Sequence, residues 1–326
     1  MGSAANRHRR VCGTDAHRLE GDLPAAPFPI AFGHEGIGRI DALGRGVCTD
    51  SAGVPVTLGD LVYWSPSGDR PGVTPVTGWP PPANVPSAAS YQDFASLPPS
   101  NIFYRIPDDT SPESVITFGC AMPTAIGALA RLGGITAGQS IVIQGSGPVG
   151  LALTVLSSLS AARQVIVIGA PDNRLAAATR FGATTTLPLE STTVMDRKEA
   201  IEGLTDGHGA DVVMEATGRM EAFPEGMDLL ANNGRYLVVG LYSGHGTVPL
   251  DPIRLNNRNQ AVIGSFGPAT HEDYRTTVHL AQRHGVRLGF ADLITHRFPL
   301  SRTSDAIAAA RTGNAIKAVV LTEGEQ

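Results

Sequence analysis

Cysteine and histidine occur together in two short strings near the start of this chain. The strings are Cys12-Gly13-Thr14-Asp15-Ala16-His17 and Gly33-His34-Glu35-Gly36. A thiolate and an imidazole are ligands that zinc prefers in proteins. Cys120 supplies a third candidate ligand. Because these residues are far apart in sequence and free cysteines are often simply buried, spacing alone leaves a structural role open for each of them.

A glycine-rich turn, Gly145-Ser146-Gly147-Pro148-Val149-Gly150, follows an apolar run and precedes a segment of small residues. Between a strand and a helix, Gly145 permits a tight turn, Gly147 lets a pyrophosphate approach the backbone, and Gly150 lets the helix pack closely on the sheet. The N-terminus of that helix attracts phosphate groups. The turn therefore predicts a dinucleotide-binding site, with a plain structural turn as the alternative.

The end of the second predicted strand, residues 165–168, bears on the choice between NAD and NADP. An Asp or Glu at this position binds the ribose 2′-hydroxyl of NAD, but this chain has Gly169 there. An uncharged residue does not repel a 2′-phosphate, and Arg174 is a candidate counter-charge, although surface arginines near a helix start are common. Both cofactors stay open, with NADP slightly favoured.

The composition is that of a globular α/β protein. With 326 residues, of which 42% are hydrophobic and 17% charged, the chain is long enough for two domains. A net charge of -5 argues against a nucleic-acid partner. No apolar run is long enough to span a membrane, and no signal-peptide core follows the basic start. We expect a cytoplasmic protein whose three cysteines are free to bind metal.

The chain changes in character near residue 123. Before it, short β-like runs at 36–40 and 61–63 are followed by a proline-rich surface loop at 65–90. After it, strands and helices alternate, which predicts a doubly wound parallel sheet. The strands are expected at 140–144, 165–168, 212–215, 236–240 and 261–265, and the helices at 125–132, 151–159, 174–181 and 223–230. The tail is expected to rejoin the first part, with two helices at 273–284 and 303–311 and a strand at 317–321.

Several of these motifs resemble the zinc-dependent alcohol dehydrogenases of the medium-chain dehydrogenase/reductase superfamily. The resemblance rests on the strings around Cys12 and His34, on Gly59-Asp60-Leu61-Val62, on the turn at 145–150, and on the closing segments 293–296 and 315–317. It implies a GroES-like, β-rich catalytic domain at 1–122 and 268–326. A Rossmann dinucleotide-binding domain would lie between these parts, at 123–267.

The resemblance also implies a set of metal ligands. Cys12, His34 and Cys120 would bind one catalytic zinc, and Glu35 would lie behind the metal as an alternate ligand. Three protein ligands leave zinc an open position for substrate. Asp15 would orient His34 by accepting its second ring N–H, unless it serves only as a helix cap.

Proton transfer and cofactor binding are assigned by the same resemblance. Thr14 would take the alcohol proton and His17 would pass it to solvent; the alternatives are a turn residue and a surface histidine. Lys317 would contact the pyrophosphate, unless it is simply solvated. The expected cofactor-binding residues are Thr124, Gly145, Gly147, Pro148, Val149, Gly150, Gly169, Arg174 and Lys317.

Two features depart from the family pattern. Many relatives carry a structural zinc held by four closely spaced cysteines, but residues 64–90 contain no cysteine, so we expect no structural zinc. Only eleven residues precede Cys12, where relatives have leading strands. We therefore expect the catalytic domain to be shortened at its N-terminus, with unpaired backbone at a sheet edge.

These observations together predict a zinc-dependent oxidoreductase that transfers hydride between an alcohol, or its aldehyde or ketone, and NAD or NADP. One alternative is a zinc-free quinone or enone reductase of the same superfamily. A second is a catalytically silent dinucleotide-binding protein. The expected partner is a small-molecule alcohol or carbonyl compound, and the strand at 261–265 could join copies of the chain into a homodimer or homotetramer.

Overall fold

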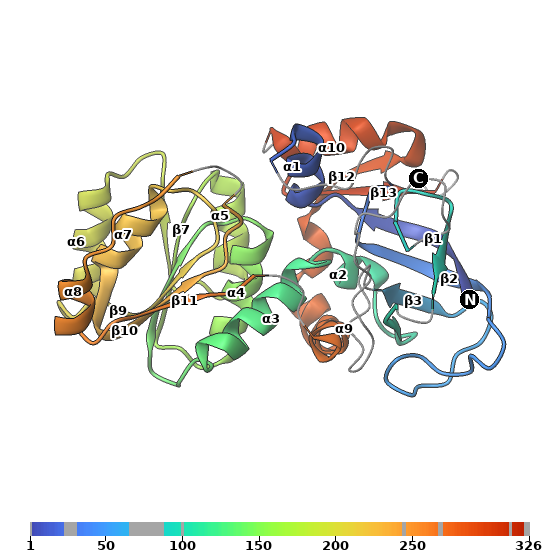
Figure 1. Cartoon of the computed structure of the whole chain (residues 1–326), viewed down its shortest axis with the longest axis horizontal. Coiled ribbons are helices and arrows are strands. Elements are labelled where there is room, and N and C mark those ends of the chain that lie inside the picture. The colour runs from blue at the N-terminus through green and yellow to red at the C-terminus, as the bar shows by residue number, and fades with distance from the viewer. Residues whose placement is uncertain are drawn as a thin grey trace. The chain divides into compact units, whose positions relative to one another are not determined.

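The structure is a computed structural model that describes residues 2–22, 31–64, 88–98, 101–242, 246–266, 270–312 and 315–322. The chain divides into two compact units, Met1–Pro123 with Thr270–Gln326, and Thr124–Ala269 (Figure 1). Most of the surface loop expected at 65–90 lies outside the described residues. Among those that are described, no helix is both long and apolar enough to cross a membrane.

The second unit is built on a six-stranded parallel sheet with the order β11-β10-β9-β6-β7-β8. The middle of each of the inner strands β6, β7 and β9 is apolar because helices cover both faces of the sheet. Val142, Ile166 and Val213 are fully buried in its core. The strands are β6 (Ser140–Gln144), β7 (Gln164–Gly169), β8 (Thr185–Pro188), β9 (Ala210–Glu215), β10 (Leu230–Val238) and β11 (Ala261–Gly264).

Two pairs of helices cover opposite faces of this sheet (Figure 1). One pair is α4 (Pro148–Leu159) and α5 (Asp172–Arg180), which lie against β6, β7 and β8. The other pair is α6 (Val194–Leu204) and α7 (Ala222–Leu229), of which α7 contacts β9 and β10. The remaining helices are α3 (Ala121–Leu132), which leads into this unit, and α8 (Pro252–Asn257).

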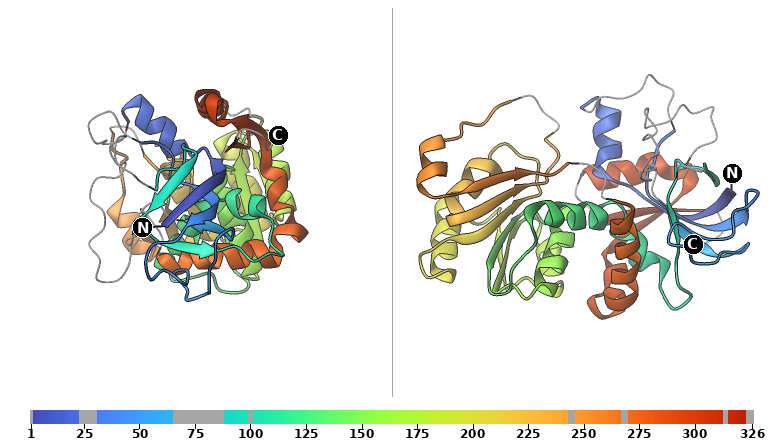
Figure 2. Two further views of the ribbon diagram at one scale, coloured as in Figure 1. Left: turned by 90° about the vertical axis from the view of Figure 1, so that its right-hand side faces the viewer. Right: turned by 60° about the horizontal axis from the view of Figure 1, so that its bottom comes forward.

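The first unit contains a seven-stranded sheet in which β12-β13-β1-β2-β3-β5 form one path and β4 pairs with β1. Only β12 and β13 run parallel; the other pairs are antiparallel. Helix α1 lies beside α10 (Figure 2), and α2 contacts α9. The elements are β1 (Gly2–Arg10), α1 (Gly13–Glu20), β2 (Gly36–Ala42), β3 (Leu61–Trp64), β4 (Phe94–Leu97), β5 (Phe103–Arg105), α2 (Pro112–Ile116), α9 (His271–Leu288), β12 (Ile294–Pro299), α10 (Thr303–Arg311) and β13 (Lys317–Leu321), with short 3-10 turns at Phe290–Leu293 and Leu300–Arg302.

The residues that precede Cys12 correct one expectation. They form β1, which lies between β13 and β2 and also pairs with β4, so the expected open edge at this place is wrong for the described residues. Arg9 of this strand is fully buried, and its Nε and Nη2 donate to the Gln92 carbonyl at 3.2 and 2.7 Å. The sequence does not predict this strand, because apolar and polar residues do not alternate along Gly2–Arg10.

Candidate metal and cofactor sites

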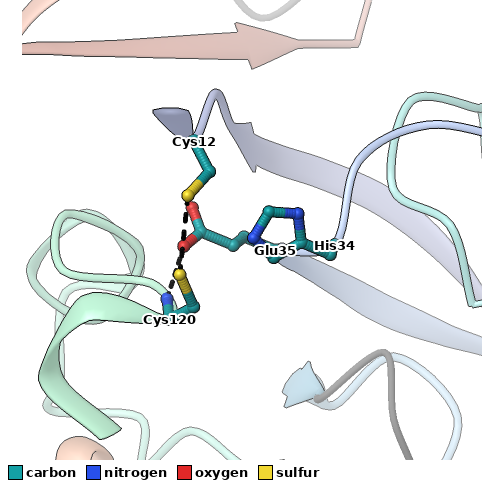
Figure 3. Close-up of side chains that lie close together, drawn as sticks. All are labelled: Cys12, His34, Glu35 and Cys120. Carbon is teal, nitrogen blue, oxygen red and sulfur yellow. Dashed lines mark hydrogen bonds between the residues drawn. The ribbon is translucent and has the colours of Figure 1, made fainter. Parts of the chain in front are cut away.

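Four side chains with metal-binding atoms converge in the first unit (Figure 3). Each of the four offers one ligand atom, and these atoms all lie within 4.8 Å of one another; the residues are Cys12, His34, Glu35 and Cys120. The two Sγ atoms are 3.6 Å apart, and neither cysteine forms a disulfide. The three candidate ligands from the sequence and the alternate ligand therefore share one place in the fold.

Three separate junctions of the fold deliver these side chains. Cys12 follows β1 and is the N-cap of α1, where its backbone N–H donates to the Asp15 side chain at 3.2 Å. His34 and Glu35 immediately precede β2. Cys120 lies between α2 and α3. Because β1 and β2 are paired, Cys12 and His34 come together although they are distant in sequence.

The donor set fits zinc. Two sulfur atoms at about 2.3 Å from a tetrahedral zinc lie about 3.8 Å apart, close to the separation found here. The same 3.6 Å is far too long for a disulfide, whose sulfurs lie about 2.05 Å apart. Two thiolates, an imidazole and a carboxylate also favour zinc over magnesium or calcium, which prefer oxygen ligands.

Glu35 reaches the site through a close approach to the chain at Gly119. Its Oε1 accepts a hydrogen bond from the backbone N–H of Cys120 at 2.5 Å. Gly119 has a φ of +43°, and a Cβ at this position would lie 2.4 Å from the Glu35 carboxyl carbon. The Gly119 carbonyl in turn accepts a hydrogen bond from the Tyr63 hydroxyl at 2.8 Å. The sequence prediction did not include Gly119 or Tyr63.

His34 lies in a negatively charged environment. Asp15 is buried, and its Oδ1 lies 3.2 Å from Nδ1 of His34, which leaves Nε2 available to a metal. Burial by itself lowers the pKa of His34, but the charges of Asp15 and Cys12 and hydrogen bonds to them raise it well above its usual value. The site therefore favours a positive charge at this imidazole, from a proton or from a metal.

The two residues expected to transfer a proton both lie on α1. Thr14 Oγ1 is 3.6 Å from Cys12 Sγ, so its hydroxyl adjoins the candidate metal ligands. His17 follows three residues later, on the same side of the helix. Its side chain is 35% exposed, and Nδ1 lies 2.9 Å from the Asp22 carboxylate. The structure thus brings Thr14 to the metal cluster and leaves His17 in contact with solvent.

The glycine turn lies between β6 and α4 in the second unit. Gly145 has a φ of +110°, and its N–H donates to the Ile168 carbonyl at 2.8 Å. A Cβ on Gly150 would lie 1.9 Å from the Gly145 carbonyl oxygen, so no other residue fits there. A Cβ on Gly147 would meet nothing within 4 Å, which leaves the backbone beside it approachable. Pro148 and Val149 begin the helix.

Gly169 ends β7 directly beside this turn. A Cβ on Gly169 would lie 2.4 Å from Ser146 Oγ and 2.6 Å from Ser146 Cβ. The Ser146 hydroxyl is buried and donates to the Ala170 carbonyl at 3.0 Å. Arg174 lies in the first turns of α5, half-buried, and burial lowers the pKa of its guanidinium. Position 169 has no room for an acidic side chain while Ser146 is present.

The remaining expected cofactor residues lie in different parts of the chain. Thr124 is a half-buried residue of α3 in the second unit. Lys317 begins β13 in the first unit and is only 2% exposed, so the alternative interpretation of a solvated lysine is wrong. The structure does not by itself assign either residue to a cofactor.

Comparison with known proteins gives the family. Residues 6–108 match the alcohol dehydrogenase GroES-like domain, and residues 148–283 match the zinc-binding dehydrogenase family. A 5-exo-hydroxycamphor dehydrogenase from Pseudomonas putida is 41% identical over 320 residues, which cover 95% of this chain and 88% of that protein. The chain belongs to the zinc-dependent alcohol dehydrogenases of the medium-chain superfamily.

Solved structures of this family share the fold. An alcohol dehydrogenase from Thermotoga maritima superimposes with a TM-score of 0.90 at 29% identity, covering 99% of this chain and 92% of that one. A putative zinc-binding dehydrogenase from Sinorhizobium meliloti, solved with NADP, has the same fold with a TM-score of 0.79 at 23% identity, covering 98% of this chain and 91% of that one. The expected fold class, a GroES-like domain with a Rossmann-like parallel sheet, is confirmed. So is the activity class, oxidoreduction between alcohols and carbonyl compounds.

Proposed function

We propose that this alcohol dehydrogenase uses NAD or NADP and one zinc ion held by Cys12, His34 and Cys120, with Glu35 as alternate ligand. The observation that carries the proposal is the convergence of these donor atoms within 4.8 Å. When bound, zinc supplies Lewis-acid chemistry that makes an alcohol hydroxyl more acidic. We propose no structural zinc held by four cysteines, because the chain has three cysteines. A reducing compartment keeps cysteines available as metal ligands, and we propose that this compartment is the cytoplasm.

The proposed proton path runs along one side of α1. Thr14 accepts the proton of the substrate hydroxyl and donates its own to His17, which releases it to solvent. The position of the Thr14 hydroxyl beside Cys12 and the partial exposure of His17 support this order. Asp22 holds the His17 ring by its Nδ1 atom.

The proposed cofactor site is the N-terminus of α4. The backbone of Gly145, Gly147 and Gly150 leaves room for the pyrophosphate, and Pro148 and Val149 begin the helix whose N-terminus attracts it. The nicotinamide ring of the cofactor exchanges hydride with the substrate carbon.

From the family resemblance, Thr124 and Val149 are proposed beside the nicotinamide ring and Lys317 at the pyrophosphate. From its position just after the end of β7, Arg174 is proposed near the ribose. The uncharged end of β7 at Gly169 supports acceptance of NADP, because no carboxylate there repels a 2′-phosphate.

The proposed substrates are cyclic secondary alcohols and the matching ketones. The relative that is 41% identical is named for the dehydrogenation of hydroxycamphor, a bridged cyclic alcohol. A panel of primary, linear secondary and cyclic secondary alcohols, each assayed with NAD and with NADP, tests the substrate class. We expect the highest kcat/KM for a cyclic secondary alcohol.

Removal of one ligand tests the metal assignment. We expect the wild-type chain to contain about one zinc, and Cys12→Ser to lose zinc and at least about 100-fold in turnover. Cofactor affinity should persist, because Cys12 and the glycine turn belong to different units. Cys48→Ser is the matched control, since Cys48 is exposed and lies outside the four-residue cluster. That variant should keep both zinc and activity.

The two alternative functions give different results in these assays. Less than half an equivalent of zinc, together with reduction of quinones or enones, would identify a zinc-free reductase. Cofactor binding without oxidation of any alcohol would identify a silent binding protein. Loss of zinc from Cys48→Ser and not from Cys12→Ser would refute the ligand assignment.

A further inference from the structure

The side chain of Tyr91 reaches the metal cluster through Asp15. Its hydroxyl donates a hydrogen bond to Asp15 Oδ2 at 2.9 Å, and the other carboxylate oxygen, Oδ1, lies 3.2 Å from Nδ1 of His34. A continuous chain of polar contacts thus runs from Tyr91 through Asp15 to the imidazole. Tyr91 is not among the sequence-predicted site residues.

Asp15 is held in one orientation by its hydrogen-bond donors. Besides the Tyr91 hydroxyl, Oδ2 accepts the backbone N–H of Cys12 at 3.2 Å. The carboxylate is only 1% exposed, so water contributes little to its solvation. With Oδ2 occupied by two donors, Oδ1 is the oxygen that faces His34. The Tyr91 hydroxyl therefore helps to decide which way the imidazole of His34 points.

The Tyr91 hydroxyl keeps its proton in this environment. Burial, together with the negative charge of Asp15 and a hydrogen bond to it, raises the pKa of Tyr91 well above its usual value. The hydroxyl is therefore the donor and the carboxylate the acceptor. The Tyr91 hydroxyl thus acts as a donor to Oδ2, and Oδ1 remains directed at His34.

The backbone fixes Tyr91 next to the segment that carries His34. The N–H groups of Ser90 and Tyr91 donate to the carbonyls of Gly33 and Phe32 at 2.9 and 3.2 Å. Gly33 has a φ of +84°, and a Cβ there would lie 2.3 Å from Ser90 Oγ and 2.9 Å from the Tyr91 ring. The absence of a side chain at position 33 thus permits the approach of Tyr91 to Asp15.

We propose that Tyr91 is a positioning residue for the zinc site, acting through Asp15 on the orientation of the His34 ring. The inference rests on the proposed zinc site and goes beyond it by adding a residue that is not one of the proposed metal ligands. Loss of the hydroxyl removes one of the two donors that hold Asp15 Oδ2, so the carboxylate can turn more easily and the imidazole is held less firmly. Zinc should then dissociate more readily while the fold is retained.

Zinc affinity of the purified protein, measured by competition with a chromophoric chelator, tests the inference. Variants that remove a partner of the metal ligands commonly lose 10- to 100-fold in affinity, so we expect Asp15→Ala to fall in this range and Tyr91→Phe to lose about 5- to 10-fold. In the Asp15→Ala background, Tyr91→Phe should have no further effect, because its partner is gone. Near-ultraviolet circular dichroism of the zinc-free variants checks that each is folded.

Tyr236→Phe is the matched control. Its hydroxyl is also buried and donates to the Gln144 side chain at 3.1 Å, but it lies in the second unit. Zinc affinity in this variant should equal that of the wild type. If Tyr91→Phe binds zinc as the wild type does, or loses the same factor with and without Asp15, the inference is wrong. If the wild type itself binds no zinc, the proposed function fails and takes this inference with it.

Discussion

A single glycine determines whether Glu35 can reach the metal cluster. At Gly119 the backbone has a φ of +43°, and any Cβ would collide with the Glu35 carboxylate. Glu35 is 1% exposed, so it has little room to withdraw. Position 119 therefore controls the approach of the carboxylate to Cys120 more directly than any charged neighbour does.

We expect Gly119→Ala to lower the free energy of unfolding by about 1–3 kcal/mol and to weaken zinc binding, because the Cβ meets Glu35 and the backbone is strained. Denaturation of the zinc-free protein and chelator competition measure the two effects. Gly46→Ala is the control, since Gly46 has a φ of +82° but open space around it. It should share the backbone strain and leave zinc affinity unchanged.

Gly169 lies against Ser146, and this contact bears on the proposed cofactor preference. The sequence alone suggests that Gly169→Asp turns the enzyme toward NAD. Because a Cβ at 169 would lie 2.4 Å from Ser146 Oγ, we expect the single variant to lose affinity for both cofactors. Gly169→Asp with Ser146→Gly should raise the kcat/KM ratio of NAD to NADP at least about tenfold. An equal rise in the single variant would contradict the steric argument.

At the scale of the helices and strands, the sequence predicts the second unit well. The expected strand at 140–144 matches β6, and the expected helix at 151–159 lies within α4. Apolar strands between amphipathic helices leave a strong periodic signal. The same rule missed β8 and the polar strand β1, because neither is a long apolar run.

Helix caps would have revealed two further elements. Helix α6 begins at Thr193, whose hydroxyl accepts the backbone N–H of Asp196 at 3.1 Å, while the Asp196 carboxylate accepts the N–H of Thr193 at 2.8 Å. This reciprocal arrangement has a recognisable spacing in sequence. Asp15 stands in the same relation to Cys12 at the start of α1. Attention to these pairs would have placed both helices.

A buried ion pair joins α6 to α7. Arg197 Nε lies 2.6 Å from Glu225 Oε1, and the two side chains are 4% and 10% exposed. We expect Glu225→Gln to lower the free energy of unfolding by about 2–4 kcal/mol, because the guanidinium is left buried without a charged partner. Urea denaturation measures this loss.

Glu202→Gln, on the helix α6 that also carries Arg197, is the control for the urea denaturation. Its partner Lys198 lies 3.9 Å away, and the side chains of Lys198 and Glu202 are 40% and 50% exposed. Exposed pairs of this kind contribute about 0.3–0.5 kcal/mol. Similar losses of unfolding free energy in Glu225→Gln and Glu202→Gln would show that the buried Arg197–Glu225 pair stabilises the fold no more than the exposed pair does.

The sequence could name the site residues but not their contacts. Cys12, His34 and Cys120 were assigned by resemblance, since nothing in their spacing requires that they meet. Their convergence depends on the pairing of β1 with β2, and β1 was not predicted. The contact of Tyr91 with Asp15 likewise depends on long-range hydrogen bonds, which no local pattern reports.

For the whole molecule, the two units carry separate parts of the chemistry. All four residues of the metal cluster belong to the first unit, and the glycine turn belongs to the second. A ligand that binds one unit stabilises the folded state of that unit by mass action. Removal of zinc should therefore lower the stability of the first unit, and removal of the cofactor should lower the stability of the second.

Assembly of the chain is expected to involve β11, an end strand of the described six-stranded sheet. Val262 in this strand is 37% exposed, and Phe266 just beyond it is 88% exposed. Exposed apolar edge strands are normally covered, and a second copy of the chain can cover this one. We expect Val262→Lys to convert a dimer to monomers in sedimentation analysis, while Val194→Lys, at a 51% exposed valine of α6, should not. A wild-type monomer, or a dimer in both variants, would contradict this assignment.

The most direct test of the metal assignment is X-ray absorption spectroscopy at the zinc edge of the purified protein. We expect about one zinc per chain, with two sulfur neighbours at about 2.3 Å and nitrogen or oxygen neighbours at about 2.0–2.1 Å. Cys120→Ser should remove one sulfur from that shell or empty the site. A zinc shell without sulfur, or a wild-type protein with far less than one zinc, would contradict the account.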